Sequence, residues 1–262
     1  MTRVVFAAAA YRWLSMFIVT SPLAVAVARP FRHHPRGDAA WFDAGGVWLL
    51  ETVRVMLPVA GGLGVVTLGL SLVFALGWSI PLGALVAAGR GARGTQAYAD
   101  AVRCGPSLAV FQGAAILAAS VLAVGAAALG TPPRVYAAGD LVRPALVLGL
   151  AGVGWWGLTV VLDAARMRRF DDDVSGALNA LYEGGVTLAR HPRLWVAAAG
   201  RTVIGLTSAV AAFAATQALA RVGAHGGVLA LVHAASGLVY VTLRTSWFRR
   251  LATVAATSDR AG

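Results

Sequence analysis

The chain has 262 residues, of which 58% are apolar or aromatic and only 13% are charged, whereas about 25% of the residues of an ordinary soluble domain are charged. This composition excludes a soluble globular protein and an intrinsically disordered one, and the single cysteine, Cys104, excludes a disulfide scaffold. The net charge of +11 would indicate nucleic acid in a soluble protein, but in a membrane protein it reports topology first, so we expect no nucleic-acid partner.

All 22 basic residues are arginine, and two interpretations of this bias are open. A GC-rich genome favours arginine codons together with those of alanine, glycine and valine. Arginine also differs from lysine in binding phosphate through a planar, two-pronged guanidinium group. Codon bias is the simpler of the two, because isoleucine is scarce as well.

Runs without charged residues predict where the chain crosses a membrane. A span needs about 20 residues, and no run shows the short apolar and polar alternation of a β-barrel strand. We therefore predict an all-α polytopic membrane bundle that forms a single integral membrane domain over residues 1–262. In the long second run, Pro58 is expected to open the helix and Pro81 to kink or end it. The predicted spans cover residues 11–28, 58–86, 106–129, 144–164, 194–219 and 227–245.

The N-terminal segment has two interpretations. Residues 1–28 are either a retained span or a cleavable signal peptide, because an apolar stretch there ends in Ala26-Val27-Ala28. The region that carries the positive charges, before the apolar stretch, is longer and more apolar than the charged region of a typical signal peptide. This favours the retained span. The predicted topology of the remaining chain is the same in both cases.

Two segments between the spans have the pattern of interfacial amphipathic helices. Residues 41–57 offer an apolar face with two tryptophans that suits the headgroup region. Residues 171–191 begin with three aspartates, which favour a helix N-terminus, and continue with apolar residues at spacings of three and four. The aspartates would alternatively fit a magnesium-diphosphate site, but the second acidic motif of such sites is missing. Residues 171–191 are a candidate surface for a cytoplasmic or membrane protein partner.

The arginines between the spans indicate the orientation. With six spans, both termini share one side, and fourteen arginines fall on that side against seven on the other. The positive-inside rule then predicts a multi-pass protein of a bacterial inner membrane with both termini in the cytoplasm. The first loop opposes this orientation, because four of its arginines would lie outside, although three acidic residues partly balance them. The arginines are Arg29, Arg32, Arg36 and Arg54, and the acidic residues are Asp38, Asp43 and Glu51.

Charged residues inside spans are costly and are functional candidates by default. Asp163 lies near the end of the fourth predicted span, and Arg201 lies seven residues into the fifth, about 10 Å at 1.5 Å per residue. Because the two lie at similar depth on adjacent helices, we predict an Asp163–Arg201 ion pair, which Gln112 of the third span would join. The pair either locks the helices together, which is the simpler interpretation, or takes part in transport or catalysis.

His233 in the sixth predicted span completes the polar candidates. A histidine at that depth can relay protons or bind a metal. No histidine shows a ligand spacing with Cys104 or with a carboxylate, so neither a metal nor a cofactor is expected. The candidate intramembrane polar network is Asp163, Arg201, Gln112 and His233.

Two sequence stretches carry a resemblance to known proteins. FDAGGVWLLETVR at 42–54 and DDDVSGALNALYEGGVTLARHPRLW at 171–195, with the six-span layout, resemble polytopic inner-membrane proteins of GC-rich bacteria. The layout is also similar to the membrane domain found with some glycerophosphodiester phosphodiesterases. The catalytic barrel of those enzymes is missing from this sequence, so the resemblance implies no activity and no catalytic residue.

Two functions remain open from the sequence. The first is a non-enzymatic membrane component, either permease-like or a scaffold, in contact with the lipid bilayer. The alternative is a membrane enzyme acting on a lipid or isoprenoid phosphate that arginines at the cytoplasmic face would hold. The first is favoured, because no pair of residues shows the pattern of a nucleophile and its base, no HExxH occurs, and no phosphate-binding loop is present.

Overall fold

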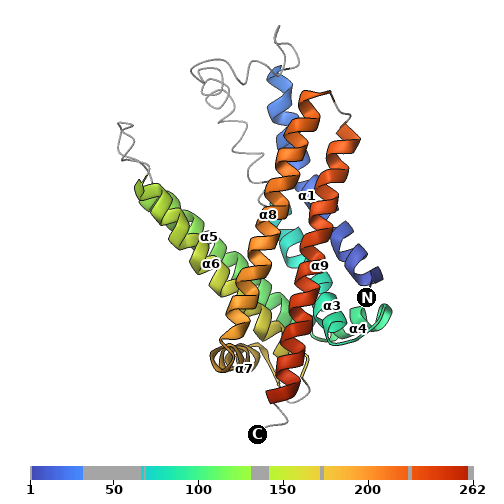
Figure 1. The fold of residues 1–262 in the computed structure, drawn as a ribbon, viewed down its shortest axis with the longest axis vertical. Coiled ribbons are helices and arrows are strands. Elements are labelled where there is room, and N and C mark those ends of the chain that lie inside the picture. The colour runs from blue at the N-terminus through green and yellow to red at the C-terminus, as the bar shows by residue number, and fades with distance from the viewer. Residues whose placement is uncertain are drawn as a thin grey trace. The chain divides into compact units, whose positions relative to one another are not determined.

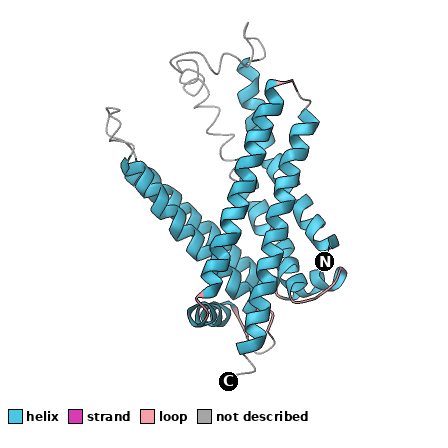
Figure 2. Ribbon diagram, in the orientation of Figure 1, coloured by secondary structure: helices cyan, strands magenta, loops and turns pink. Residues whose placement is uncertain are grey.

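The computed structural model describes residues 2–31, 66–67, 69–130, 142–171, 174–223 and 226–258. Every regular element in these ranges is a helix, and no strand occurs in them (Figure 2). The predicted all-α architecture is therefore confirmed. The helices are α1 (Thr2–Phe31), α3 (Ser79–Gly89), α4 (Thr95–Arg103), α5 (Gly105–Gly130), α6 (Val142–Arg168), α7 (Ala177–Arg190), α8 (Arg193–Arg221) and α9 (Gly226–Ser258).

Six stretches of the described helices are long and apolar enough to cross a bilayer, as the charge-free runs predict. The protein is therefore a membrane protein. The candidate spans are Thr2–Val19, Gly69–Gly89, Gly105–Gly125, Ala145–Arg168, Arg193–Leu219 and Gly226–Thr257.

The helices differ from the prediction in where they begin and end. The first helix begins at Thr2 rather than at residue 11, and the last continues to Ser258 rather than ending at residue 245. The second span is interrupted by a turn at Trp78, and Pro81 lies in the first turn of α3, where its missing N–H is not needed. Pro58 and the amphipathic segment 41–57 lie outside the described residues.

The chain divides into two compact units, one formed by Tyr11–Ala75 and the other by Met1–Ala10 with Leu76–Gly262. In the first unit, the Tyr11 hydroxyl donates a hydrogen bond to the Phe74 carbonyl at 3.0 Å. The rings of the two residues pack edge to face, with their centres 6.2 Å apart. The second unit holds α3 to α9 and all the polar groups discussed below. A single membrane domain over residues 1–262 stays a prediction.

In the second unit, the buried core lies at one end of the helices, which we call the packed end. There α3 packs against α5 and α9, α4 packs against α3 and α5, and α7 packs against α6. From this end the α5–α6 hairpin and the α8–α9 hairpin diverge (Figure 1). The packed end buries Leu82, Leu85, Leu108, Phe111, Leu162, Met167, Leu188, Trp247, Phe248 and Leu251.

Away from the packed end, the hairpins expose large apolar side chains. A soluble protein rarely leaves such continuous apolar surface in water, whereas lipid tails cover it at no cost. The exposed side chains include Leu117, Val121 and Val124 of α5, Leu146, Leu150 and Val153 of α6, and Val203, Leu206 and Val210 of α8.

Helix α7 is amphipathic, but it begins later than the sequence predicts. Gly176, with a positive φ of 81°, precedes the first helical residue, Ala177, and no side chain caps the helix. Asp171 therefore does not start α7, which corrects the prediction of a capping role. Instead, Arg90 and Arg168 both donate to the Asp171 carboxylate. Asp172 and Asp173 lie outside the described residues.

The inner face of α7 packs closely on α6 at Gly184. A Cβ atom at this position would lie 2.6 Å from the backbone nitrogen of Ala165. Such a distance is too short for any side chain, so only glycine permits this approach. On the outer face, Leu178 is 83% exposed and Tyr182 is 68% exposed. Since α7 connects two candidate spans, an exposed apolar face of this kind suits the membrane interface.

Candidate functional site

Four helices bring charged and amide side chains together just inside the packed end. We call Asp163, Arg166, Arg201 and Arg244 the arginine cluster. Asp163 is five residues from the end of α6, and Arg201 is eight residues after the start of α8. At 1.5 Å per residue, both lie about 8–12 Å from the helix ends.

The Asp163 carboxylate accepts hydrogen bonds from all three arginines of the cluster. Arg166 Nη1 lies 3.0 Å from Asp163 Oδ1, and Arg244 Nη2 lies 2.5 Å from the same oxygen. Arg201 Nη1 lies 3.3 Å from Oδ2. Asp163 and Arg166 share one face of α6 because they are three residues apart, whereas the other two arginines come from α8 and α9.

The four side chains of the cluster differ in solvent exposure: two are buried and two are partly exposed. The Asp163 side chain is 0% exposed and that of Arg166 is 3% exposed. The Arg201 side chain is 17% exposed and that of Arg244 is 12% exposed. Arg166 is further held by Gln112 of α5, whose Oε1 accepts a bond from Nη2 at 3.2 Å. Arg166 is thus fully engaged with the protein, and Arg201 and Arg244 form the accessible side.

Charge is not balanced within the cluster. Three guanidinium groups face one carboxylate, and no second carboxylate pairs with them among the described residues. Arg244 Nη1 donates to the Tyr240 hydroxyl at 2.7 Å, but the buried Nε of Arg244 has no hydrogen-bond partner there. An unpaired buried charge is expensive, so the excess of two positive charges requires an explanation.

Aromatic rings surround the accessible side of the cluster. The Arg201 guanidinium lies 5.2 Å from the centre of the Trp247 ring, within the range of a cation–π interaction. Beside it, Trp156 Nε1 of α6 donates to Thr202 Oγ1 of α8 at 3.0 Å, which ties the two helices together near Arg201. These contacts hold Arg201 in place without neutralising its charge.

The structure contains the predicted Asp163–Arg201 ion pair and brings Gln112 into the same network through Arg166. It does not bring His233 there. His233 lies eleven residues before Arg244 in α9, about 16 Å along the helix at 1.5 Å per residue, and its Nε2 is hydrogen-bonded to Thr216 Oγ1 at 3.3 Å. The polar network therefore excludes His233.

Sequence reasoning missed Arg166 and Arg244. The arginine count behind the predicted orientation places both on the cytoplasmic face, because Arg166 lies just beyond the predicted span 144–164 and Arg244 lies at the very end of the predicted span 227–245. In the structure, α6 continues through Arg168 and α9 through Ser258, so both arginines lie within helices. The i, i+3 spacing of Asp163 and Arg166 was the available signal.

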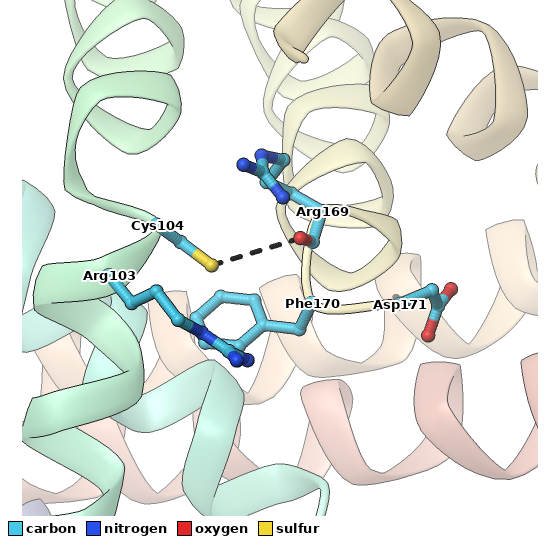
Figure 3. Close-up of a pocket in the computed structure, with 5 residues that line it drawn as sticks. All are labelled: Arg103, Cys104, Arg169, Phe170 and Asp171. Atoms are coloured by element: carbon cyan, nitrogen blue, oxygen red, sulfur yellow. Dashed lines mark hydrogen bonds between the residues drawn. The ribbon is translucent and has the colours of Figure 1, made fainter. Parts of the chain in front are cut away.

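A second group of polar residues fixes the end of α6 beside the start of α5. Arg169 Nε donates to Ser107 Oγ at 2.9 Å, and the Cys104 thiol donates to the Arg169 carbonyl at 3.8 Å. A small cavity of about 210 Å³ lies here. Figure 3 shows the described residues that line it, among them Arg103, Arg169 and Phe170. Among the described residues of its lining, the only carboxylate is that of Asp171. Since it is already paired with Arg90 and Arg168, we interpret this group as structural.

A larger cavity of about 610 Å³ lies where the turn between α7 and α8 meets the last turns of α9. We call it the basic cavity. Its polar lining is Arg190, His191, Arg193, Arg250 and Thr253, and its apolar lining includes Leu194, Ala197 and Val254. Among the residues that the structure describes, no aspartate or glutamate lines it.

Comparisons with known proteins give no functional assignment. No known protein family, curated protein or solved structure matches this chain. Within the described ranges, no three histidine, cysteine, aspartate or glutamate side chains converge as metal ligands would. The function must therefore be inferred from the arginine cluster and its surroundings.

Proposed function

We propose that the protein is a permease-like membrane component that binds an anionic solute at the arginine cluster. The observation that carries the proposal is the ratio of three guanidinium groups to one carboxylate. A lock between helices needs only one cation for each carboxylate. Two further cations at a buried position instead favour an anion that arrives from outside the chain.

Arg201 and Arg244 are the residues that would contact this anion. They are the partly exposed members of the cluster, and the Arg244 Nε is without a partner among the described residues. A guanidinium group binds a carboxylate or phosphate through two parallel N–H donors. Asp163 would then hold the arginines in position and lower their mutual repulsion while the site is empty.

The position of the cluster fits a solute-dependent movement of helices. Asp163 belongs to the α5–α6 hairpin, whereas Arg201 and Arg244 belong to the α8–α9 hairpin (Figure 1). An anion that competes with Asp163 for the two arginines would change the attraction between the hairpins. A permease requires such a link between solute binding and helix position.

The finer placement of the protein is part of the same proposal. We place it in a bacterial inner membrane as a multi-pass protein with both termini in the cytoplasm, on the strength of the arginine distribution. The exposed outer face of α7, with Leu178 and Tyr182, supports residues 171–191 as the surface for a protein partner. Purification from mild detergent as this chain alone would contradict the partner.

Anion binding can be tested on the purified protein in detergent. We expect inorganic phosphate or succinate, at matched ionic strength, to raise the unfolding temperature in a saturable way, because a ligand that binds only the folded state stabilises it. Arg201→Gln should abolish the saturable rise. Proteoliposomes loaded with the stabilising anion should then show flux with the native protein and not with this variant.

Arg221→Gln is the matched control. Arg221 is an exposed arginine at the opposite end of the same helix, so the change in net charge is identical. This variant should keep the rise in unfolding temperature. If neither anion stabilises the native protein more than chloride does, the arginine cluster is a helix lock and the proposal fails.

One observation keeps the alternative of a membrane enzyme open. His191 lines the same cavity as Arg190, Arg193 and Arg250, which is the arrangement that acid–base chemistry on a lipid phosphate would need. Asp163 does not fit that role, because three arginines occupy its carboxylate. If His191→Ala left a measured lipid turnover unchanged, we would abandon this alternative.

A further inference from the structure

We infer that the basic cavity is a binding site for the phosphate headgroup of an anionic phospholipid. The inference is independent of the proposed anion site in the arginine cluster, because the two sites share no residue. It rests on the chemistry of the cavity lining, the lack of a counter-charge and the position of the cavity at the ends of two spans.

The lining of the cavity is amphipathic in the way that a phospholipid is. Arg190, Arg193 and Arg250 present three guanidinium groups, and His191 and Thr253 add polar groups. Leu194, Ala197 and Val254 form an apolar wall on α8 and α9. The guanidinium groups suit a phosphate, and the apolar wall suits the start of an acyl chain.

The three arginines have no counter-charge in the part of the chain that the structure describes. No carboxylate lines the cavity, and no ion pair is formed by Arg190, Arg193 or Arg250 within the described ranges. Like charges that converge on one cavity repel each other, so an anion that binds there relieves the repulsion. The volume of about 610 Å³ is large enough for a headgroup.

The position of the cavity favours a lipid over a free phosphate ion. Arg193 is the first residue of the candidate span Arg193–Leu219, and Arg250 lies seven residues before the end of the span Gly226–Thr257. The cavity is therefore at the membrane boundary, where headgroups are concentrated. Basic pockets between the ends of transmembrane helices bind anionic headgroups in this way.

Native mass spectrometry of the purified full-length protein tests the inference. The protein is released from mixed micelles of detergent with phosphatidylglycerol or phosphatidylcholine, and the bound intact lipid is measured. We expect phosphatidylglycerol to be retained over phosphatidylcholine. The Arg193→Gln/Arg250→Gln double variant should weaken that retention by about 25-fold, at about fivefold for each arginine near the surface.

Three comparisons make the outcome decisive. Arg221→Gln and Arg201→Gln should both retain phosphatidylglycerol as the native protein does, which separates this site from general charge loss and from the arginine cluster. Equal retention of the two lipids, or full retention by the double variant, would overturn the inference. It would also be overturned if inorganic phosphate displaced the lipid at equal concentration, because the source of the phosphate would then be the solution. Circular dichroism of the double variant checks that these exposed substitutions leave the helices intact.

Discussion

The arginine cluster and the basic cavity each gather three arginines, and α9 contributes one to each of them. The buried cluster contains a carboxylate, Asp163, that all three arginines share, whereas no described carboxylate lines the exposed cavity. Buried guanidinium groups need a built-in counter-charge because water cannot reach them. Exposed ones are stabilised by water, salt and lipid headgroups. The comparison shows that the environment of an arginine, rather than its presence, determines what it requires from the fold.

The largest expected effect comes from removing the built-in counter-charge. Asp163→Asn leaves three arginines without their shared carboxylate, so the free energy of unfolding should fall by about 3–5 kcal/mol. Denaturant unfolding in detergent measures this loss.

Asp100→Asn is the matched control for that change, because Asp100 forms no ion pair within the described part of the chain. Its unfolding should be close to that of the native protein. Adding Arg244→Gln to Asp163→Asn should recover part of the stability, since one of the unpaired charges is removed. A double variant that is less stable than Asp163→Asn alone would contradict the electrostatic explanation.

A smaller effect is expected from disturbing α7, which contributes Arg190 to the basic cavity and no residue to the arginine cluster. Gly184→Ala places a Cβ atom 2.6 Å from the Ala165 backbone, so α7 must move away from α6. Overpacking of this kind costs about 1–3 kcal/mol. Because α7 carries Arg190, phosphatidylglycerol retention should fall, while the anion response of the arginine cluster should persist.

Gly185 provides the comparison for this substitution. A Cβ atom there would meet nothing within 4 Å. Gly185→Ala should therefore keep both stability and lipid retention, with a slight gain from the helix propensity of alanine. Equal losses in the two variants would show that α7 does not depend on close packing at Gly184.

The smallest effect is expected from a change in salt concentration, to which the two sites should respond differently. Mobile ions screen exposed charges over about 8 Å at physiological ionic strength, but they screen buried pairs much less. Raising the salt concentration should weaken phosphatidylglycerol retention and leave the stability loss of Asp163→Asn unchanged. Lipid retention that does not respond to salt would show that the cavity holds its lipid through apolar contacts.

The helical architecture could be predicted from the sequence because the bilayer demands long apolar helices. The Asp163–Arg201 pair could also be predicted, since the depth of each residue in its span follows from counting along the helix. Prediction from the sequence fails for residues whose environment depends on how the helices pack. In the sequence, Arg166 lies just beyond a predicted span and Arg244 at the end of another, and only the contacts of α5, α6, α8 and α9 make them interior.

The role of Asp171 shows a second limit of sequence reasoning. Its position beside two further aspartates is typical of a helix cap, and nothing local indicates that Arg90 reaches it from 81 residues away. His233 was grouped with the network by its polarity, although its position in α9 separates it from Arg244. The resemblance to six-span inner-membrane proteins stays a prediction.

Helix α9 runs for 33 residues, from Gly226 to Ser258, about 50 Å at 1.5 Å per residue. Arg244 and Arg250 are six residues apart on this one helix, with neither glycine nor proline between them. If such a segment moves as one piece, a solute that displaces Arg244 also displaces Arg250. Thermodynamic linkage then makes the effect reciprocal: whatever factor the solute imposes on lipid affinity, the lipid imposes on solute affinity. Membrane composition would thereby set the range of solute concentration over which the proposed anion site is filled.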